Sequence, residues 1–496
     1  MEFSLELLTD SSIQVIPILF LLAVGLILMI LDAFKSREVL PFITALGFLG
    51  SAILALAYGD PNSHLAFSGM METGGIAPLV HVFLCLSGLF TQFFLSDYLR
   101  RQDKPISDVY ALLVFSVIGM ILMANANNLI MTFIGLETMS IALYIFAGLY
   151  KADPKSNEAG MKYFLLGSFA SAFLLFGISL IYGIAGTLDL TTIANGIAQN
   201  KDFLHGSKEL IFYTAAGLIL IGFLFKVSAF PFHNWTPDVY EGTPTPLAGF
   251  MATGSKLAAF VALGVVMQKM DFFSTANTKL ITVVALAAFL TMVYGNIVAA
   301  RQQNLKRMLA YSSIAHSGYV LLGLCAGKEG FIAVIFYMAI YTLMNIGAFG
   351  LVGMAESDYP DTQMNRWRGM GFKSPYFAAA LSIFLFSLAG IPPLAGFMGK
   401  YFVFITAIRA ELILLATVGI LSSVIGAYYY IKVIMLMYFG KDEYPEVGTT
   451  FNIIPLTGAA LLVLLILLLG VAPDLIMGPI GAAFPGSGPE TYSVLP

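Results

Sequence analysis

Fourteen runs of mostly apolar residues divide this chain of 496 residues, and they constrain its fold more than any other feature. A helix needs about 20 residues to cross the roughly 30 Å of bilayer hydrocarbon. Only 11% of the residues are charged, against about 25% in soluble globular proteins. We therefore expect an all-α polytopic membrane protein with about 14 transmembrane helices. The runs lie near 13–34, 40–58, 76–96, 109–126, 128–149, 159–185, 209–240, 244–268, 277–300, 304–326, 329–355, 376–409, 411–439 and 453–472.

Most connections between these runs are short, so we expect one membrane domain over 1–496. The first run follows no positively charged segment, and we expect it to be a retained span instead of a signal peptide. Within the domain we distinguish four parts. They are a three-helix segment at 1–108, a first repeat at 109–268, a second repeat at 277–439, and a last helix and tail at 440–496.

The basic residues predict the orientation of the chain. Loops after odd-numbered runs carry fifteen lysines and arginines, and loops after even-numbered runs carry six. Loops rich in these residues usually face the cytoplasm. We therefore expect both termini on the opposite, periplasmic side. The four basic residues that remain lie inside the runs.

Ionisable residues at mid-depth are the best candidates for function, because a charge at the bilayer centre costs about 2.5–3.5 kcal/mol on insertion scales. Glu137 lies in the fifth run and Lys256 in the eighth, while Lys226 and Lys400 lie in two longer runs. A single lysine that pairs for packing is the competing interpretation. Four such residues on four helices favour a path for protons or ions.

Two of the runs are too long for one crossing and contain proline. The seventh includes Pro231 and the twelfth includes Pro392, 161 residues later. Proline breaks a helix, and in a membrane such a break is tolerated only beside a cavity or inside protein. Ordinary proline kinks are the alternative. The spacing favours two inverted five-helix repeats, made of runs 4–8 and 9–13, with broken helices 7 and 12.

Two further side chains are weaker candidates. His316 lies in the tenth run among serines and tyrosines, and histidine titrates near neutral pH, so His316 could relay protons or could only bond neighbouring helices. Lys432 follows three tyrosines in the thirteenth run, at uncertain depth. His81 and His233 carry less weight still.

Several segments resemble a known family. The chain has the glutamate and lysines named above, with FPFHNWTPDVYEGTPTP at 230–246, LKRMLAYSSIAHSGY at 305–319 and GIPPLAGF at 390–397. Together they resemble the antiporter-like membrane subunits of bacterial respiratory complex I, and within that family the subunit N branch of NADH:quinone oxidoreductase. The resemblance covers essentially the whole chain.

The resemblance implies a proton-translocating subunit of the bacterial inner membrane. It implies that Glu137, Lys226, Lys256 and Lys400 form the proton path, with His316 as a possible relay and Lys432 as a weaker member. The implied partners are the other membrane-arm subunits, especially an adjacent antiporter-like subunit and the small membrane subunits. FMN, iron–sulfur clusters and quinone would belong to partner subunits. Two cysteines are too few to ligate a cluster on this chain, and no basic patch suggests nucleic acid.

Two alternatives stay open at this stage. The chain could be a subunit of a multi-subunit cation/proton antiporter, which uses similar sites without redox coupling. It could also be a structural scaffold in which the lysines only pair helices. Whether sodium replaces the proton is also undecided by the sequence.

Overall fold

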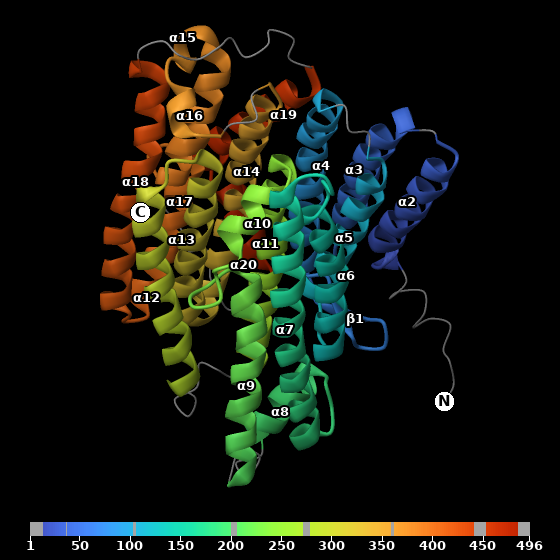
Figure 1. Cartoon of the computed structure of the whole chain (residues 1–496). Helices are drawn as coiled ribbons and strands as arrows, with labels where there is room; N and C mark the ends of the chain where they lie inside the picture. Colours follow the sequence, from blue (N-terminus) through green and yellow to red (C-terminus); the bar gives the residue numbers. More distant parts are fainter. Residues whose placement is uncertain are drawn as a thin grey trace.

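The computed structural model describes residues 13–35, 37–102, 106–199, 206–270, 278–358, 362–440 and 453–484 as a bundle of helices (Figure 1). Within these residues, twelve helices are long and apolar enough to cross a membrane. Two more apolar helices are shorter, Asp108–Ala124 and Pro375–Ala389. The helical membrane fold is confirmed, and the number of fourteen crossings stays a prediction.

The elements follow one another along the chain with few long connections. They are α2 (Ile16–Ala33), α3 (Leu40–Ala57), β1 (His64–Ala66), β2 (Met71–Thr73), α4 (Ala77–Arg101), α5 (Asp108–Ala124), α6 (Leu129–Ala147), α7 (Pro154–Ala185), α8 (Leu190–Gln199), α9 (Ser207–Lys226), α10 (Thr236–Gly242), α11 (Thr245–Lys269), α12 (Thr278–Arg301), α13 (Leu305–Cys325), α14 (Gly327–Asp358), α15 (Met370–Lys373), α16 (Pro375–Ala389), α17 (Ala395–Arg409), α18 (Ile413–Phe439), α19 (Ile453–Val471) and α20 (Asp474–Ala482), with short 3-10 turns at Arg37–Val39 and Met364–Trp367.

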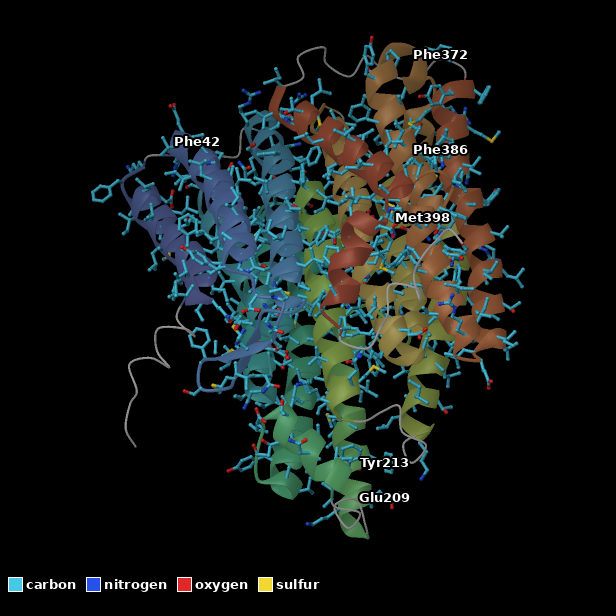
Figure 2. All side chains as sticks on the ribbon, turned by 180° about the vertical axis from the view of Figure 1, so that it is seen from behind. Phe42, Glu209, Tyr213, Phe372, Phe386 and Met398 are labelled. Atoms are coloured by element: carbon cyan, nitrogen blue, oxygen red, sulfur yellow. The ribbon has the colours of Figure 1, made fainter. Side chains whose placement is uncertain are left out.

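Three helices form the centre of the bundle. The most apolar stretches of α11 and α13 are each 94% buried and that of α14 is 100% buried, whereas those of α2, α18 and α19 are 33% buried. The outer helices instead turn large apolar side chains outward, such as Phe42 and Phe372 (Figure 2). Polar groups on the central helices therefore need partners inside the protein.

Both predicted helix breaks are present. The seventh run forms α9 and α10, separated by residues 227–235, and the twelfth forms α16 and α17, separated by residues 390–394. Each gap contains a cis peptide bond before proline, Phe230–Pro231 and Pro392–Pro393. Of the four helix halves, only α9 is long enough to cross a membrane, and α10, α16 and α17 are shorter.

The two halves of the chain share a second feature, which the sequence analysis did not use. Asn128 caps α6 by accepting a hydrogen bond from the backbone of Ile130, and Asn304, 176 residues later, caps α13 in the same way. Asn128 also forms a backbone bridge with Asp189, and Asn304 forms one with Gln363. These bridges tie each cap to the segment that follows the next helix. They support the two predicted repeats, whose inverted relation stays a prediction.

Some short elements were not predicted. The prediction that the chain beyond Pro473 is only a tail is wrong for residues 474–482, because they form α20 and bury Ile476, Met477 and Ile480. The short antiparallel pair of β1 and β2 and the amphipathic helix α8 fall in segments that we treated as loops. The end of the predicted tail, residues 485–496, lies outside the described residues.

Candidate functional site: a buried chain of lysines and hydroxyl groups

Lys226 is the last residue of α9, directly before the first helix break. Its side chain is buried, and its Nζ donates hydrogen bonds to Ser140 Oγ (2.8 Å) and to the Tyr163 hydroxyl (3.3 Å). Tyr163 also stacks on Trp235, which lies beyond the break, with ring centroids 4.4 Å apart. Two helices and the far side of the break therefore surround this amino group.

Glu137 lies one helical turn before Ser140 on α6, but it does not contact Lys226. Its carboxylate accepts a hydrogen bond from Ser171 of α7, and no ion pair joins it to Lys226 within the described chain. A cavity of about 10 Å³ lies beside Ser140, Ser171 and Lys226, roughly the space that one water needs. Glu137 and Lys226 thus each bond to a serine hydroxyl, and they do not form a direct ion pair.

Lys256 lies near the middle of α11 and is 1% exposed. Its Nζ makes three contacts with α13, to the Ser313 carbonyl (3.0 Å), the Ser313 hydroxyl (2.7 Å) and the Ser317 hydroxyl (2.9 Å). Three oxygen acceptors match the three N–H donors of an ammonium group. Ser313 and Ser317, on two consecutive turns of α13, thus bind the amino group of this lysine.

His316 lies on α13 between these two serines. Its Nδ1 is 2.5 Å from the Tyr337 hydroxyl and its Nε2 is 3.1 Å from the Tyr430 hydroxyl. Its ring also packs edge-on against Tyr319, with centroids 5.6 Å apart. The histidine therefore has a hydrogen-bonding partner on each ring nitrogen, which is the arrangement that proton exchange at imidazole needs.

Lys400 lies in α17, directly after the second helix break. Its Nζ donates to the carbonyl of Ala389 (2.9 Å), the last residue of α16, and to Ser423 Oγ of α18 (2.9 Å). The carbonyl is one that the broken helix leaves without an intrahelical partner. Nζ also lies 5.5 Å from the centre of the Tyr319 ring, whose hydroxyl accepts a hydrogen bond from Asn296.

Lys256, His316 and Lys400 thus form one polar chain in the bundle, and Lys226 lies in a separate polar cluster with Ser140 and Tyr163. Ser313 and Ser317 link Lys256 to the turn that carries His316, and Tyr319 lies between His316 and Lys400. No direct hydrogen bond joins Lys226 to Lys256 among the described side chains. Lys432 does not join this chain, because it is half-buried on α18 and lines a groove on the outer face.

The polar residues around the first break include a further set. Ser228 Oγ, Thr236 Oγ1 and both ring nitrogens of His233 are buried without a hydrogen-bond partner in the described chain. Such groups in native proteins usually bond to ordered water. The break between α9 and α10, which follows Lys226, therefore offers several polar atoms to which water molecules can hydrogen-bond.

An ion-pair network holds α10 on the side of the bundle where α7 and α13 begin. Asp238 pairs with Lys162 (2.8 Å) and Arg307 (2.9 Å), and Glu241 pairs with Lys155 (2.8 Å) and Arg307 (2.6 Å). These residues were not among the predicted site residues. The sequence contains an indication of this network, because the acidic residues Asp238 and Glu241 in the 230–246 segment need basic partners if they pack against the bundle.

A second buried pair lies next to this network. Lys306 is 3.4 Å from a carboxylate oxygen of Glu356 and donates to the backbone carbonyl of Thr243 (2.6 Å). Thr245 also donates to Glu356. This pair ties the start of α11 to α13 and to the end of α14.

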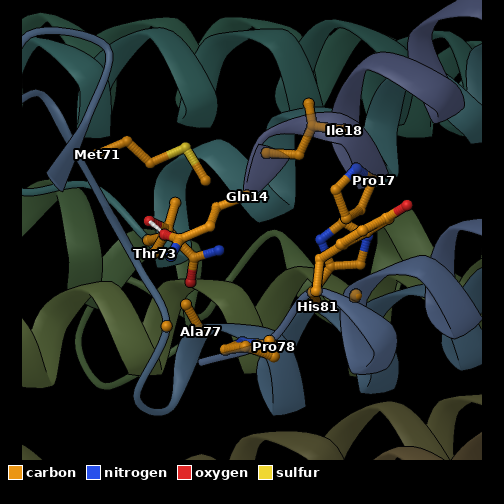
Figure 3. A pocket seen from close by; sticks show the side chains of 13 residues that line it. Gln14, Pro17, Ile18, Met71, Thr73, Ala77, Pro78 and His81 are labelled. Carbon is orange, nitrogen blue, oxygen red and sulfur yellow. Dashed lines mark hydrogen bonds between the residues drawn. The ribbon is translucent and has the colours of Figure 1, made fainter. Parts of the chain in front are cut away.

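Another small cavity, of about 30 Å³, lies apart from the lysine chain, among α2, α3, α4 and the β1–β2 hairpin (Figure 3). His81 lies on its wall and bonds to Ser51 Oγ (2.8 Å), while Thr73 donates to Gln14. This histidine bonds neighbouring helices, as its low weight in the sequence suggested. Over the described residues, no group of three or more His, Cys, Asp or Glu side chains lies close enough to hold a metal ion.

The comparisons with known proteins decide the family. A sequence model described as NADH:quinone oxidoreductase/Mrp antiporter, TM, matches residues 126–426. The chain belongs to this family. The matched segment contains Glu137, Lys226, Lys256, His316 and Lys400, and it ends before Lys432.

Relatives match over nearly the whole chain. The chain is 39% identical over 475 residues to NADH-quinone oxidoreductase subunit N 1 of Chloroherpeton thalassium, covering 94% of this chain and 97% of that protein. It is 41% identical over 433 residues to subunit N of Salinibacter ruber, covering 86% and 84% of the two chains. The resemblance to the subunit N branch is therefore confirmed.

Solved structures give the same fold. A chain of respiratory complex I from Thermus thermophilus matches with a TM-score of 0.79 and 31% identity, covering 94% of this chain and 99% of that chain. A chain of an archaeal membrane-bound sulfane sulfur reductase matches with a TM-score of 0.84 and 24% identity, covering 96% of each. A chain of the Mrp complex from Dietzia matches with a TM-score of 0.83 and 19% identity, covering 96% of this chain and 97% of that chain. The last two likenesses concern the fold alone.

The ion-pair network predicts that Arg307 stabilises the attachment of α10. Arg307→Gln removes two ion pairs, each about a third exposed, and we expect a loss of about 1 kcal/mol in stability. The midpoint of thermal aggregation of the chain in the solubilised complex measures this loss. Arg100→Gln is the control, because Arg100 is 65% exposed in its single pair with Asp97; an equal decrease for both variants would contradict the role of the network.

Proposed function

We propose that this chain is subunit N of a bacterial NADH-quinone oxidoreductase and that it translocates protons through the buried lysine chain. The observation that carries the proposal is that three deeply buried lysines each bond to hydroxyl or carbonyl oxygens of neighbouring helices, with His316 between two of them. A group that gains and loses a proton inside a membrane needs such polar partners for its charged form.

The proposed route begins at Lys226. Protons reach it from the cytoplasmic side through the polar break that contains Ser228 and His233. They pass by water to Lys256, through the serines and His316 of α13, and on to Lys400. Lys400 then releases them outward. Glu137 acts on Lys226 through its charge, across Ser140 and Ser171, because opposite charges a few ångströms apart favour the charged lysine.

The energy for this movement comes from other subunits. FMN, iron–sulfur clusters and quinone are expected in the partner subunits, where NADH oxidation takes place. The partners of this chain are the other membrane-arm subunits, including an adjacent antiporter-like subunit and the small membrane subunits. The chain lies in the bacterial inner membrane with both termini in the periplasm, as the distribution of basic residues favours.

Co-purification separates this proposal from the alternative of a cation/proton antiporter subunit. The family includes both kinds of protein, but the relatives with about 40% identity carry the subunit N name. We expect mild-detergent purification of a tagged chain to recover NADH-oxidising subunits, identified by mass spectrometry. Isolation with antiporter subunits alone, or as a monomer, would remove redox coupling from the proposal.

Lys226→Ala tests the start of the route. We expect proton pumping by inverted membrane vesicles to decrease about tenfold or more, because the variant lacks the titrating group, and we expect Glu137→Gln to decrease it less. The measurement is NADH-driven quenching of a pH-sensitive dye, with the amount of assembled complex determined in parallel. Lys208→Ala is a matched control, since Lys208 is exposed at the opposite end of the same helix. Full pumping by an assembled Lys226→Ala complex would exclude Lys226 from the route.

Lys400→Arg tests the end of the route. Arginine keeps the positive charge but does not release its proton at any accessible pH. A proton carrier therefore fails with arginine, whereas a fixed structural charge does not. We expect normal assembly with impaired pumping, measured as the ratio of protons moved to electrons transferred. A normal ratio would show that Lys400 serves only as a charge that binds the freed carbonyl of Ala389.

A further inference from the structure

A groove of about 750 Å³ lies on the outer face of the bundle, at the end of α18 that leads to Gly440. Lys432 contributes to it from α18, and Arg368 contributes from the segment before α15. A backbone hydrogen bond from Gly369 to Leu436 (3.3 Å) fixes that segment against α18. The proposed proton route does not use this site.

The groove is positively charged. Arg368 and Lys432 are both half-buried, and among the residues that the structure describes no acidic residue lines the groove with them. Neither cation has a hydrogen bond or an ion pair within the described chain. Lys155, Lys162 and Arg307, by contrast, all pair with carboxylates.

The walls of the groove are apolar and face outward. Tyr428, Ile431, Met435 and Phe439 lie on one face of α18, at intervals of three or four residues, and all are at least partly exposed. Phe439 is 81% exposed and lies at the helix end. Two cations beside an apolar strip are the chemical complement of an anionic head group and its acyl chain.

We propose that this groove binds an anionic phospholipid, with its phosphate at Arg368 and Lys432 and an acyl chain along Ile431 and Tyr428. Lys432 lies seven residues before Phe439, about 10 Å along the helix axis, and a lysine stem lies along apolar surface while its ammonium extends to the interface. Basic pockets on the cytoplasmic side of membrane helices attract anionic lipids. The distribution of lysines and arginines over the loops of the chain predicts that this groove lies on that side.

Photolabelling of the whole complex in nanodiscs tests the site. Phosphatidylglycerol and phosphatidylcholine, each with a diazirine in one acyl chain, are compared at equal mole fraction, and labelled peptides of α18 are quantified by mass spectrometry. Each juxtamembrane cation strengthens binding to anionic lipid by several fold, so we expect phosphatidylglycerol to label α18 about tenfold more strongly. Excess unlabelled phosphatidylglycerol should suppress this labelling, whereas millimolar inorganic phosphate should not.

Charge variants then test which residues hold the head group. Arg368→Gln combined with Lys432→Gln should lower phosphatidylglycerol labelling to the phosphatidylcholine level. The control combines Lys35→Gln with Lys151→Gln, which removes two exposed cations from the same side. Equal labelling by the two lipids in the unaltered complex overturns the proposal, and this comparison needs no variant. Suppression by phosphate alone, or the absence of labelling because a neighbouring subunit covers the groove, overturns it as well.

Discussion

The burial of lysine amino groups inside an apolar bundle is the constraint on which the rest of this structure depends. A charged lysine at the bilayer centre costs several kcal/mol unless protein oxygens or water surround it. Each buried lysine of this chain accordingly draws oxygen atoms from other helices. Lys226 bonds to α6 and α7, Lys256 to α13, and Lys400 to α16 and α18. The lysines therefore determine which helix faces must meet, and the apolar packing fills the space around these contacts.

The helix breaks supply part of what the lysines need. An unbroken helix satisfies its own carbonyl groups and offers none to a neighbour. The break after Ala389 frees the carbonyl that Lys400 binds, and the break after Lys226 contains buried polar groups such as those of Ser228 and His233. Each break costs backbone hydrogen bonds, which a membrane protein recovers only where polar partners or water are close. Each break lies next to a lysine because both need hydrogen-bonding partners. The buried lysine needs oxygen acceptors, and the broken helix has backbone carbonyl groups without intrahelical partners.

The sequence predicted the helices and the two breaks, because each depends on local pattern. Apolar runs predict spans, and proline predicts a break. The depth of the lysines in the membrane stays a prediction. The sequence did not predict which hydroxyl groups receive the lysines, since Ser313, Ser317 and Ser423 are chosen by how helices rotate against one another. It also missed α20, whose buried residues gain their stability from tertiary contacts and not from a long apolar pattern.

Lys256 and Lys432 show why depth along a helix alone does not decide the role of a lysine. They lie 176 residues apart, the same spacing that separates Asn128 from Asn304, so they occupy similar places in the two halves. Their surroundings differ, because the apolar stretch of α11 is 94% buried and that of α18 is 33% buried. On α11 every face meets protein, and Lys256 must find its partners inside the bundle. On α18 one face is exposed, and Lys432 is only half-buried there. The packing of the helix, and not the position of the residue in it, therefore separates the buried lysine from the surface lysine.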